Sequence, residues 1–579
     1  MTRAVRKLFK SRRVFGILLV VIYATLAIGS TWPLARFSTT CLPTGTSESL
    51  TVPMFNLWTI WWNTEGFLQG TNSYWNAPIF HPIQNTFAFS EPQTITMLMA
   101  PINWFTDSRV LTYNIYLWLS LLFNGLFTFL LLRKLGVNRS IAIGGGAAML
   151  LLPIVHWQLD VVQLTPLWGI LWTWLVLLKI SRHPTLLRGA ELGIAFGFTF
   201  LICGHQGLFL AVLLLGATWT LWKRCLNPIL WATFAVGVSV AALLTGPVIF
   251  HLKQAANENN FIRSSNTVLQ LSALPGDYTA STGRQLINLN TREAHDQRRL
   301  SPGWFKIGLA ITGVIIGLIR NRWRWWTVFI LITLLLAFSL SLGPNLRIYE
   351  WRPWWTLTEY CPGFSQVRNV FRFAFFVQMT IVLLAAQGLY GAFLLSKTFC
   401  AKKLQNYLAK PALLILGLIA LFEVTPPSPA LGKTPSADRH AGWITYIQEN
   451  TPPDHAIACV PFARGVKVKD FESTTRWMYF ATFHGVPLVN GYSGFFPDEY
   501  FEISEAINTE PPSEAIFRQL ADSKVEFLVV MRSQVKVKSF SDTRFDTVSL
   551  EHVYSDPVGV DVYRLQRIET LRYGMTNQY

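Results

Sequence analysis

The chain has 579 residues, of which 51% are hydrophobic and 14% are charged. Soluble domains usually carry about 25% charged residues, so this composition excludes an ordinary soluble protein, and its apolar content excludes a disordered or fibrous one. Lysine and arginine outnumber aspartate and glutamate by 49 to 32, which gives a formal net charge of +17. Such an excess is also typical of nucleic-acid-binding proteins, so its distribution along the chain decides what it means.

Long apolar segments dominate the first three quarters of the chain. A helix needs about 17–25 mostly apolar residues to cross a bilayer, and we count eleven such segments, which predict a polytopic helix bundle. The first segment follows a basic stretch but is too long for a signal peptide and lacks a cleavage site, so we expect a retained helix. The expected spans are residues 14–33, 111–132, 140–156, 163–180, 188–203, 207–222, 229–250, 303–319, 325–342, 371–396 and 409–425.

The basic residues lie on one side of this predicted bundle. With the N-terminus inside, the inner stretches hold 21 lysines and arginines and one acidic residue, Glu191, which leaves 28 basic and 31 acidic residues elsewhere. Short cytoplasmic loops accumulate lysine and arginine, so the charge indicates orientation in the membrane and not binding of nucleic acid. The odd number of spans then predicts an outer C-terminal segment, which is periplasmic if the membrane is a bacterial inner membrane.

Two long parts of the chain are expected on the outer side. The first outer loop, residues 34–110, is rich in tryptophan (Trp58, Trp61, Trp62, Trp75, Trp104), which predicts an interfacial or re-entrant helix at 53–68. The second part follows the proline-rich stretch 425–429, which is typical of a linker. We therefore expect a mainly α-helical membrane domain over residues 1–428 and a small soluble α/β domain over 429–579.

The pattern inside the soluble part predicts several elements. Apolar runs at 455–462 and 525–531 predict strands, residues 512–523 predict an amphipathic helix, and residues 547–566 predict a pair of strands.

Acidic residues of the first outer loop are the candidate bases. Glu91 lies in Phe89-Ser90-Glu91-Pro92, where the loop returns to the membrane and a carboxylate would face a substrate that rises from the bilayer. The alternative is a structural carboxylate that accepts hydrogen bonds from backbone N–H groups after Ser90. Glu48 and Glu65 are expected to be solvated.

Polar residues at the outer ends of helices are further candidates. His156 and Asp160 lie in the short turn after the third span, and His205 lies in the turn after the fifth. Ionisable groups near the membrane are costly, so they are candidates for substrate binding, with turn or packing roles as the alternative. Their spacing lacks a His-x-x-x-His pattern, so we do not expect them to form a zinc site.

Arginines are sparse on the outer side and therefore informative. Arg368 and Arg372 lie four residues apart where the tenth span begins, so on a helix they would present two guanidinium groups on one face, suited to a lipid phosphate or pyrophosphate. The alternative is that they extend toward lipid headgroups. Arg284 is a weaker candidate for the same role. The chain lacks Walker and dinucleotide motifs, so ATP-driven transport finds no support.

Six cysteines are divided between the two sides of the membrane. Cys41 and Cys361 both fall in outer loops, where an oxidising compartment permits a disulfide, and they are the pair that we would choose. Free buried thiols are the alternative.

Several short motifs together carry a resemblance that covers nearly the whole chain. They are Asn56-Leu57-Trp58, Phe80-His81-Pro82, Phe89-Ser90-Glu91-Pro92, Leu111-Thr112-Tyr113-Asn114, Leu342-Gly343-Pro344, Pro362-Gly363-Phe364 and Asn490-Gly491-Tyr492-Ser493-Gly494. With them, the sequence resembles the GT-C-type polytopic membrane glycosyltransferases, especially a bacterial branch with a soluble C-terminal domain. The resemblance implies transfer of a sugar from a polyprenyl-phosphate donor on the outer face of the membrane, with a divalent cation as one candidate cofactor.

The resemblance also assigns roles to residues. It implies that Glu91 is the second acidic position of the first outer loop and that Arg368 and Arg372 contact the donor phosphate. Asn490 and Tyr492 lie in a glycine-rich aromatic loop, which suits contacts with a sugar, so they are candidates to cover the acceptor, a glycan, lipid or protein. The alternative is a tight turn between strands. In similar sequences an Asp-Pro pair precedes the Asn-x-Trp motif, whereas Val52-Pro53 stands here. Either Glu91 or Glu48 then replaces the missing base, and Glu48 lies four residues too early, so Glu91 is preferred.

Three functions remain open on the sequence alone. The first is a lipid-linked sugar transferase. The second is a protein that has lost the reaction with the acid at position 52 and binds polyprenyl-linked glycans or scaffolds an envelope assembly. The third is a lipid-linked glycan transporter, against which the absence of a convincing internal repeat counts.

Overall fold

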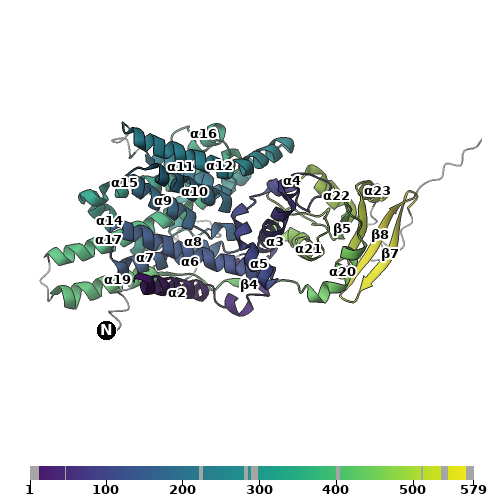
Figure 1. The fold of residues 1–579 in the computed structure, drawn as a ribbon, viewed down its shortest axis with the longest axis horizontal. Coiled ribbons are helices and arrows are strands. Elements are labelled where there is room, and N and C mark those ends of the chain that lie inside the picture. The colour runs from purple at the N-terminus through teal and green to yellow at the C-terminus, as the bar shows by residue number, and fades with distance from the viewer. Residues whose placement is uncertain are drawn as a thin grey trace, which may run out of the picture.

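The computed structural model describes residues 12–45, 47, 49–218, 220, 226–261, 263–279, 284–287, 298–399, 404–509, 513–535 and 545–568. Figure 1 shows a bundle of long helices on one side and a domain with a small sheet on the other, with α3, α4 and α5 between them. This arrangement confirms the predicted fold class, a mainly helical membrane part followed by a small C-terminal α/β part.

Each segment expected to span the membrane is mainly helical in its described residues. By length and composition, seven described helical stretches could cross a membrane, and these make the chain a multi-pass membrane protein: Arg12–Ser30 (α2), Arg109–Leu135 (α6), Arg139–Trp157 (α7 and α8), Val162–Ile180 (η5 and α9), Pro228–Glu258 (α12), Asn321–Ser341 (α15) and Val370–Phe399 (η10 and α17). The remaining expected spans form shorter helices, α10 (Leu186–Ile202), α11 (Gly204–Thr218), α14 (Trp304–Ile319) and α19 (Lys410–Phe422), so the count of eleven spans stays a prediction.

Helix α17 (Ala374–Phe399) is the centre of the bundle, because nearly all of its first half is buried. Glycines let α14 approach it closely: a Cβ atom at Gly313 or at Gly388 would collide with a backbone carbonyl of the facing helix. The hydrophobic effect does not hold helices together in lipid. Small residues at such positions instead allow close van der Waals packing between the helices.

The predicted interfacial helix is instead buried. Helix α3 (Thr51–Glu65) leaves only Val52 and Glu65 partly exposed, because α21 (Glu472–His484) of the C-terminal domain packs on it. Of the five tryptophans in the first outer loop, Trp104 alone is exposed, at 54%. Trp58, Trp62 and Trp75 pack around Phe87, and Trp61 packs on Trp62. These tryptophans therefore belong to an aromatic core and not to a belt at the lipid headgroups.

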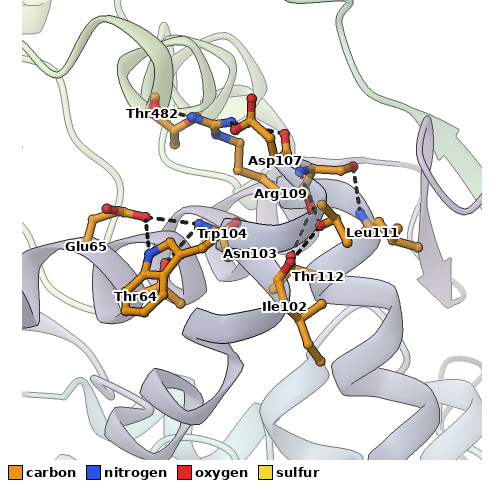
Figure 2. Close-up of polar contacts among 12 residues, drawn as sticks. Thr64, Glu65, Ile102, Asn103, Trp104, Asp107, Arg109, Leu111, Thr112 and Thr482 are labelled. Carbon is orange, nitrogen blue, oxygen red and sulfur yellow. Dashed lines mark hydrogen bonds and ion pairs between the residues drawn. The ribbon is translucent and has the colours of Figure 1, made fainter.

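A polar junction fixes the C-terminal domain to the membrane part, as Figure 2 shows. Helix α5 (Ala100–Thr106) turns into α6 (Arg109–Leu135), and Arg109 donates to the carbonyl of Thr482 at 3.0 Å and lies 4.2 Å above the Phe483 ring. On the other side of this junction, Glu65 accepts hydrogen bonds from Asn103 (3.1 Å) and Trp104 (3.2 Å). Glu65 therefore holds the first outer loop together.

The C-terminal domain is built on a four-stranded sheet in the order β5-β6-β8-β7, in which β5 and β6 are parallel and the other pairs antiparallel. The predicted strands and helix are confirmed: β5 (Ala456–Val460), β6 (Val525–Met531), β7 (Val548–Asp556), β8 (Val560–Arg567) and α23 (Glu514–Asp522). Helices α20 (Ala441–Asn450) and α22 (Asp498–Asn508) complete it.

Near the predicted domain boundary at residues 428 and 429, β4 (Ala430–Lys433) pairs with β1 (Cys41–Gly45) of the first outer loop. The described Cys41 and Cys361 are free thiols, so the chosen disulfide is wrong. Cys41 lies in β1, whereas Cys361 follows α16 (Pro353–Tyr360), which lies across the bundle from β4, the partner of β1, in Figure 1.

Candidate active site

A cavity of about 660 Å³ lies where the membrane helices meet the C-terminal domain. Its wall is made by the first outer loop, the turn between α10 and α11, the end of α12, the segment before α17, and residues 492–495 of the C-terminal domain. The residues that give it chemical character are Val52, Glu91, His205, Lys253, Arg263, Arg368, Arg372 and Tyr492. Four of the predicted site residues thus meet in one place with Glu91: His205, Arg368, Arg372 and Tyr492.

Helix α3, which contains the Asn-x-Trp motif, holds the loop that carries Glu91. Asn63 on α3 donates to the carbonyls of Pro92 (2.7 Å) and Gln93 (3.2 Å). Gln93 in turn donates to the side-chain oxygen of Asn56 at 2.7 Å. Asn56 and Asn63 lie two helical turns apart and so share a face of α3, which explains why amides are needed there. These bonds fix the position of Glu91 relative to α3.

The carboxylate of Glu91 is saturated with donors. It accepts the backbone N–H of His205 at 2.7 Å, a bond from the His205 ring, and a weak bond from the Cys203 thiol at 3.5 Å. Burial alone would raise the pKa of Glu91, but the charge and hydrogen bonds of His205, together with the charge of Arg372, lower it to about 2. Glu91 is therefore an anion that organises the turn at the start of α11.

Three of these side chains could hold a metal ion. The ligand atoms of Glu91, Cys203 and His205 lie within 4.8 Å of one another. A carboxylate, a thiol and an imidazole are donors that suit zinc, and three protein ligands with one open position are typical of a catalytic site. Among the described residues, these three donors, and not the set His156, Asp160 and His205, lie close enough together to hold a divalent cation. A cation bound there would supply positive charge for a leaving phosphate.

The arginines gather as predicted, with one addition. Arg368 lies between η9 (Phe364–Gln366) and η10 (Val370–Phe373), Arg372 lies within η10, and both precede the α-helix that was expected to carry them. Arg263 joins them from the loop after α12, and nothing near it in the sequence marks it as a site residue. In the described part of the chain, none of the three has a carboxylate oxygen within 4 Å. Such a cluster suits an anionic ligand.

Arg263 also connects this cluster to the C-terminal domain. It donates to the carbonyl of Gly494 at 2.8 Å, and its guanidinium lies 3.5 Å from the Phe495 ring centre. Burial, followed by the nearby charge of Arg368, lowers the pKa of Arg263 to about 9. Phe261 stacks on Phe495 at 4.2 Å, and the N–H of Phe495 donates to the carbonyl of Phe89 at 3.0 Å. The loop 492–495 thereby closes one side of the cavity.

Val52 of α3 lies in the cavity wall, and Asp160 of the turn before η5 (Val162–Leu164) lies beside it. Val52 lines the cavity at the position where the family resemblance predicts an aspartate. Asp160 is half-buried beside the cavity wall, next to the lining residue Val161. Burial raises the pKa of Asp160 to about 7 against the opposing attraction of Arg372 and nearby backbone N–H groups. Glu48, the second candidate base, lies outside the described residues.

The structure places the remaining predicted site residues elsewhere. His156 is buried with its ring bonded to the carbonyl of Leu150 at 3.2 Å, so it supports a turn and does not line the cavity. Arg284 lies in the two-residue strand β2 (Arg284–Gln285), which pairs with β3 (Val424–Thr425) away from the lining residues. Asn490 is fully buried and bonds to the backbone of Cys459 in β5.

Replacing Asn490 by alanine is expected to destabilise the C-terminal domain by about 2–3 kcal/mol, because two buried backbone groups of β5 lose their partners. Its amide donates to the carbonyl of Cys459 at 2.8 Å and accepts from the N–H at 2.7 Å. Thermal unfolding followed by near-ultraviolet circular dichroism measures the change. Asn450, exposed at the end of α20, provides a control, since Asn450→Ala should leave the unfolding temperature unchanged. Equal stability of Asn490→Ala and the native chain would contradict the structural role.

Comparison with solved structures defines the fold. Over 96% of this chain, the arabinofuranosyltransferase AftD from mycobacteria matches with a TM-score of 0.55 and 13% sequence identity, and the match covers 40% of that chain. ArnT from Cupriavidus metallidurans, in a structure bound to undecaprenyl phosphate, matches 96% of this chain and 98% of its own with a TM-score of 0.47 and 12% identity. The match to AftD shows that the chain has the fold of the GT-C-type polytopic membrane glycosyltransferases. The chain spans about 40% of the length of the arabinofuranosyltransferase.

No protein-family profile and no curated protein sequence matches the chain.

Proposed function

We propose that this chain is a membrane glycosyltransferase that transfers a sugar from a polyprenyl-phosphate donor to a glycan, lipid or protein acceptor. One observation supports this most strongly: Arg263, Arg368 and Arg372, none of which has a carboxylate oxygen within 4 Å among the described residues, meet the Glu91–His205 pair in a cavity at the end of the membrane helices. A guanidinium group binds a phosphate by two parallel hydrogen bonds, and this interaction is stronger in a partly buried site than in water.

The cavity wall fits a lipid-linked donor. Apolar residues from the membrane helices line one part of it, among them Phe200, Leu208 and Ile249. Polar residues of the C-terminal loop, Tyr492 and Ser493, line another part. In the proposed arrangement the polyprenyl chain lies along the helices, the phosphate meets Arg368 and Arg372, and the sugar faces Glu91 and Tyr492. The acceptor enters beside the C-terminal domain.

The proposal includes a location. The charge distribution of the sequence favours the inner membrane of a bacterium, with the N-terminus in the cytoplasm and the C-terminal domain in the periplasm. The similarity to ArnT and AftD belongs to the fold alone, so the sugar and the acceptor have to be found by experiment.

A second function is favoured by one specific residue. Val52 lines the cavity where an aspartate is expected, and valine neither accepts a proton nor binds a metal. A chain that binds polyprenyl phosphates without turnover would serve as a glycan-binding or scaffold protein of the cell envelope.

The experiment that separates the two uses purified chain in lipid vesicles with labelled sugars on polyprenyl monophosphate. Binding and transfer are measured with the native chain, with Arg368→Gln, and with Arg347→Gln as a matched control, because Arg347 is an exposed arginine paired with Glu350. We expect Arg368→Gln to weaken donor binding about tenfold or more and Arg347→Gln to leave it unchanged. Binding without transfer would favour the scaffold function, and absence of both would overturn the proposal.

A further inference from the structure

A second cavity, of about 600 Å³, lies within the helix bundle. Three of its walls are formed by α7 (Arg139–Leu150), α14 and α17, and each of these helices contacts α19, which forms the fourth wall (Figure 1). None of the residues that line it also lines the cavity of the candidate active site. Ligand sites in proteins usually have volumes of about 300–1,000 Å³, so this space is large enough for a bound molecule.

The cavity follows α19 along its length. Its lining residues on α19 recur every three or four positions from Lys410 to Leu421, so one face of the helix borders the cavity throughout. At 1.5 Å per residue this is a rise of roughly 16 Å, about half of the roughly 30 Å hydrocarbon thickness of a bilayer. Leu414 and Leu418 line the cavity and are 64% and 46% exposed, so the cavity meets the lipid-facing surface along α19. Its length and its opening fit one chain of a lipid from one leaflet.

Protein side chains leave this space unfilled. Within α19, which is described throughout, Ala420 alone is buried, although the helix contacts three others. Small residues of the facing helices, among them Ala148 and Ala385, line the opposite walls. Helices in lipid are held together largely by van der Waals packing, and an empty gap forfeits those contacts. A lipid chain between α19 and the other helices would restore them.

A run of three glycines in α7 gives an independent sign of an occupant. A Cβ atom at Gly145 would collide with the Leu132 side chain, and one at Gly146 would collide with the Tyr23 hydroxyl, so close packing explains both. Gly144 lines the cavity, and a Cβ atom there would meet nothing within 4 Å. Glycine is unfavourable inside a helix, so packing within the protein does not account for this third glycine. Its missing side chain instead widens the cavity.

One end of the cavity is basic. This end, the mouth, is formed by Asn138 and Ser140 around the start of α7, by Phe393 near the end of α17, and by Lys410 at the start of α19. The exposed Lys397 adds a second ammonium group, 4.7 Å from the ring centre of Phe393. The mouth therefore carries two lysines and two polar side chains that suit a phosphate group.

No acid of the same segments offsets this charge. The mouth residues belong to residues 108–159 and 360–422, and neither stretch of the sequence contains an aspartate or a glutamate. At the opposite end, the buried ammonium group of Lys306 donates to the carbonyl of Pro302 at 2.9 Å and lies near Glu423, so its charge is engaged inside the protein. A basic mouth above an apolar cavity is complementary to an anionic lipid.

We propose that this cavity binds an anionic membrane phospholipid, with one acyl chain between α19 and the facing helices and the phosphate at Lys397 and Lys410. It is a second lipid site, separate from the proposed donor site, and it does not depend on the transfer reaction. Because the lipid binds only the folded bundle, it stabilises the contact of α19 with the other helices.

The test counts the lipids that the full chain retains. The chain is reconstituted in vesicles of equal amounts of phosphatidylglycerol and phosphatidylcholine with identical acyl chains, extracted into detergent, and analysed by native mass spectrometry. Gly144→Leu places a side chain in the cavity. Gly16→Leu on α2 is the control, since a Cβ atom at Gly16 also meets nothing within 4 Å and Gly16 does not line the cavity. We expect Gly144→Leu to retain one phosphatidylglycerol fewer per chain than the native protein and the control.

A second variant tests the headgroup contact. In Lys397→Gln/Lys410→Gln, the preference of this site for phosphatidylglycerol over phosphatidylcholine should fall about tenfold, because each lysine near the membrane surface attracts anionic lipid. The site is isolated by subtracting the lipids that Gly144→Leu retains. Lys433→Gln/Lys469→Gln removes two exposed lysines after the membrane part and should keep the native preference.

Three results would overturn the inference. The first is equal retention of phosphatidylglycerol by Gly144→Leu and the native chain, with circular dichroism confirming that the variant is folded. The second is a native lipid preference in Lys397→Gln/Lys410→Gln, which decides the matter even where Gly144→Leu does not fold. The third is replacement of the retained phosphatidylglycerol by an equal concentration of polyprenyl monophosphate, which would make the occupant a polyprenyl lipid.

Discussion

Exchanging Glu91 for glutamine is expected to lower transfer by about 10²–10³-fold, the cost of removing one preorganised electrostatic partner from an active site. The amide is nearly isosteric, but it replaces one acceptor oxygen by a donor that would face the N–H of His205. It also removes the negative charge that lies beside Arg372 and Cys203. The turn at the start of α11 and the position of the arginine would both change.

Transfer of labelled sugar by the purified variant measures this effect, and Glu65→Gln is the matched control. Glu65 belongs to the same loop and also accepts two hydrogen bonds, yet it lies away from the cavity. Its variant should keep most of the activity. Full transfer by Glu91→Gln would show that the carboxylate takes no part in the reaction or in holding the arginines.

The largest expected effect on stability comes from Glu423, at the end of α19. This carboxylate is 0% exposed and accepts the backbone N–H of Phe305 at 2.9 Å and that of Trp304 at the start of α14, while buried Lys306 lies near it. Replacement by alanine leaves a buried cation and helix N–H groups without their acceptor. We expect the free energy of unfolding to fall by about 3–5 kcal/mol, because two backbone N–H groups lose a charged acceptor and the charge of a nearby buried lysine is no longer compensated.

Thermal unfolding in detergent, followed by circular dichroism, checks this expectation. Glu350→Ala is the control, because Glu350 is 94% exposed and its pair with Arg347 lies on the surface, where ion pairs contribute little. A Glu423→Ala protein that unfolds at the native temperature would contradict the structural role of the carboxylate.

The sequence predicted the helices and the strands of the C-terminal sheet well, because their signals are local: long apolar runs for the bundle and short ones for β5 and β6. The environment of α3 could not be predicted in this way. Its tryptophans have the composition of a headgroup belt, and they are buried only because α21, about 400 residues later, covers them.

For the site as well, local signals could be predicted and contacts between distant parts of the chain could not. Glu91, His205 and the pair Arg368 and Arg372 were found because charged residues are rare at helix ends in a membrane protein. Arg263 was missed because nothing near it in sequence marks it, and no site role was predicted for Cys203, whose neighbour Glu91 is 112 residues away. His156 and Asn490 had the right chemistry, but their side chains turn toward backbone groups that only the fold brings near.

The position of loop 492–495 has a consequence for biogenesis. Most of the cavity wall is formed by residues before 373. Phe495, which contacts Phe261 and Arg263, belongs to a segment that is synthesised after every expected membrane helix. Domains generally fold in order as the ribosome releases them. A newly inserted bundle therefore exposes its arginine cluster until the C-terminal domain has been synthesised and has folded, and only then is the cavity complete.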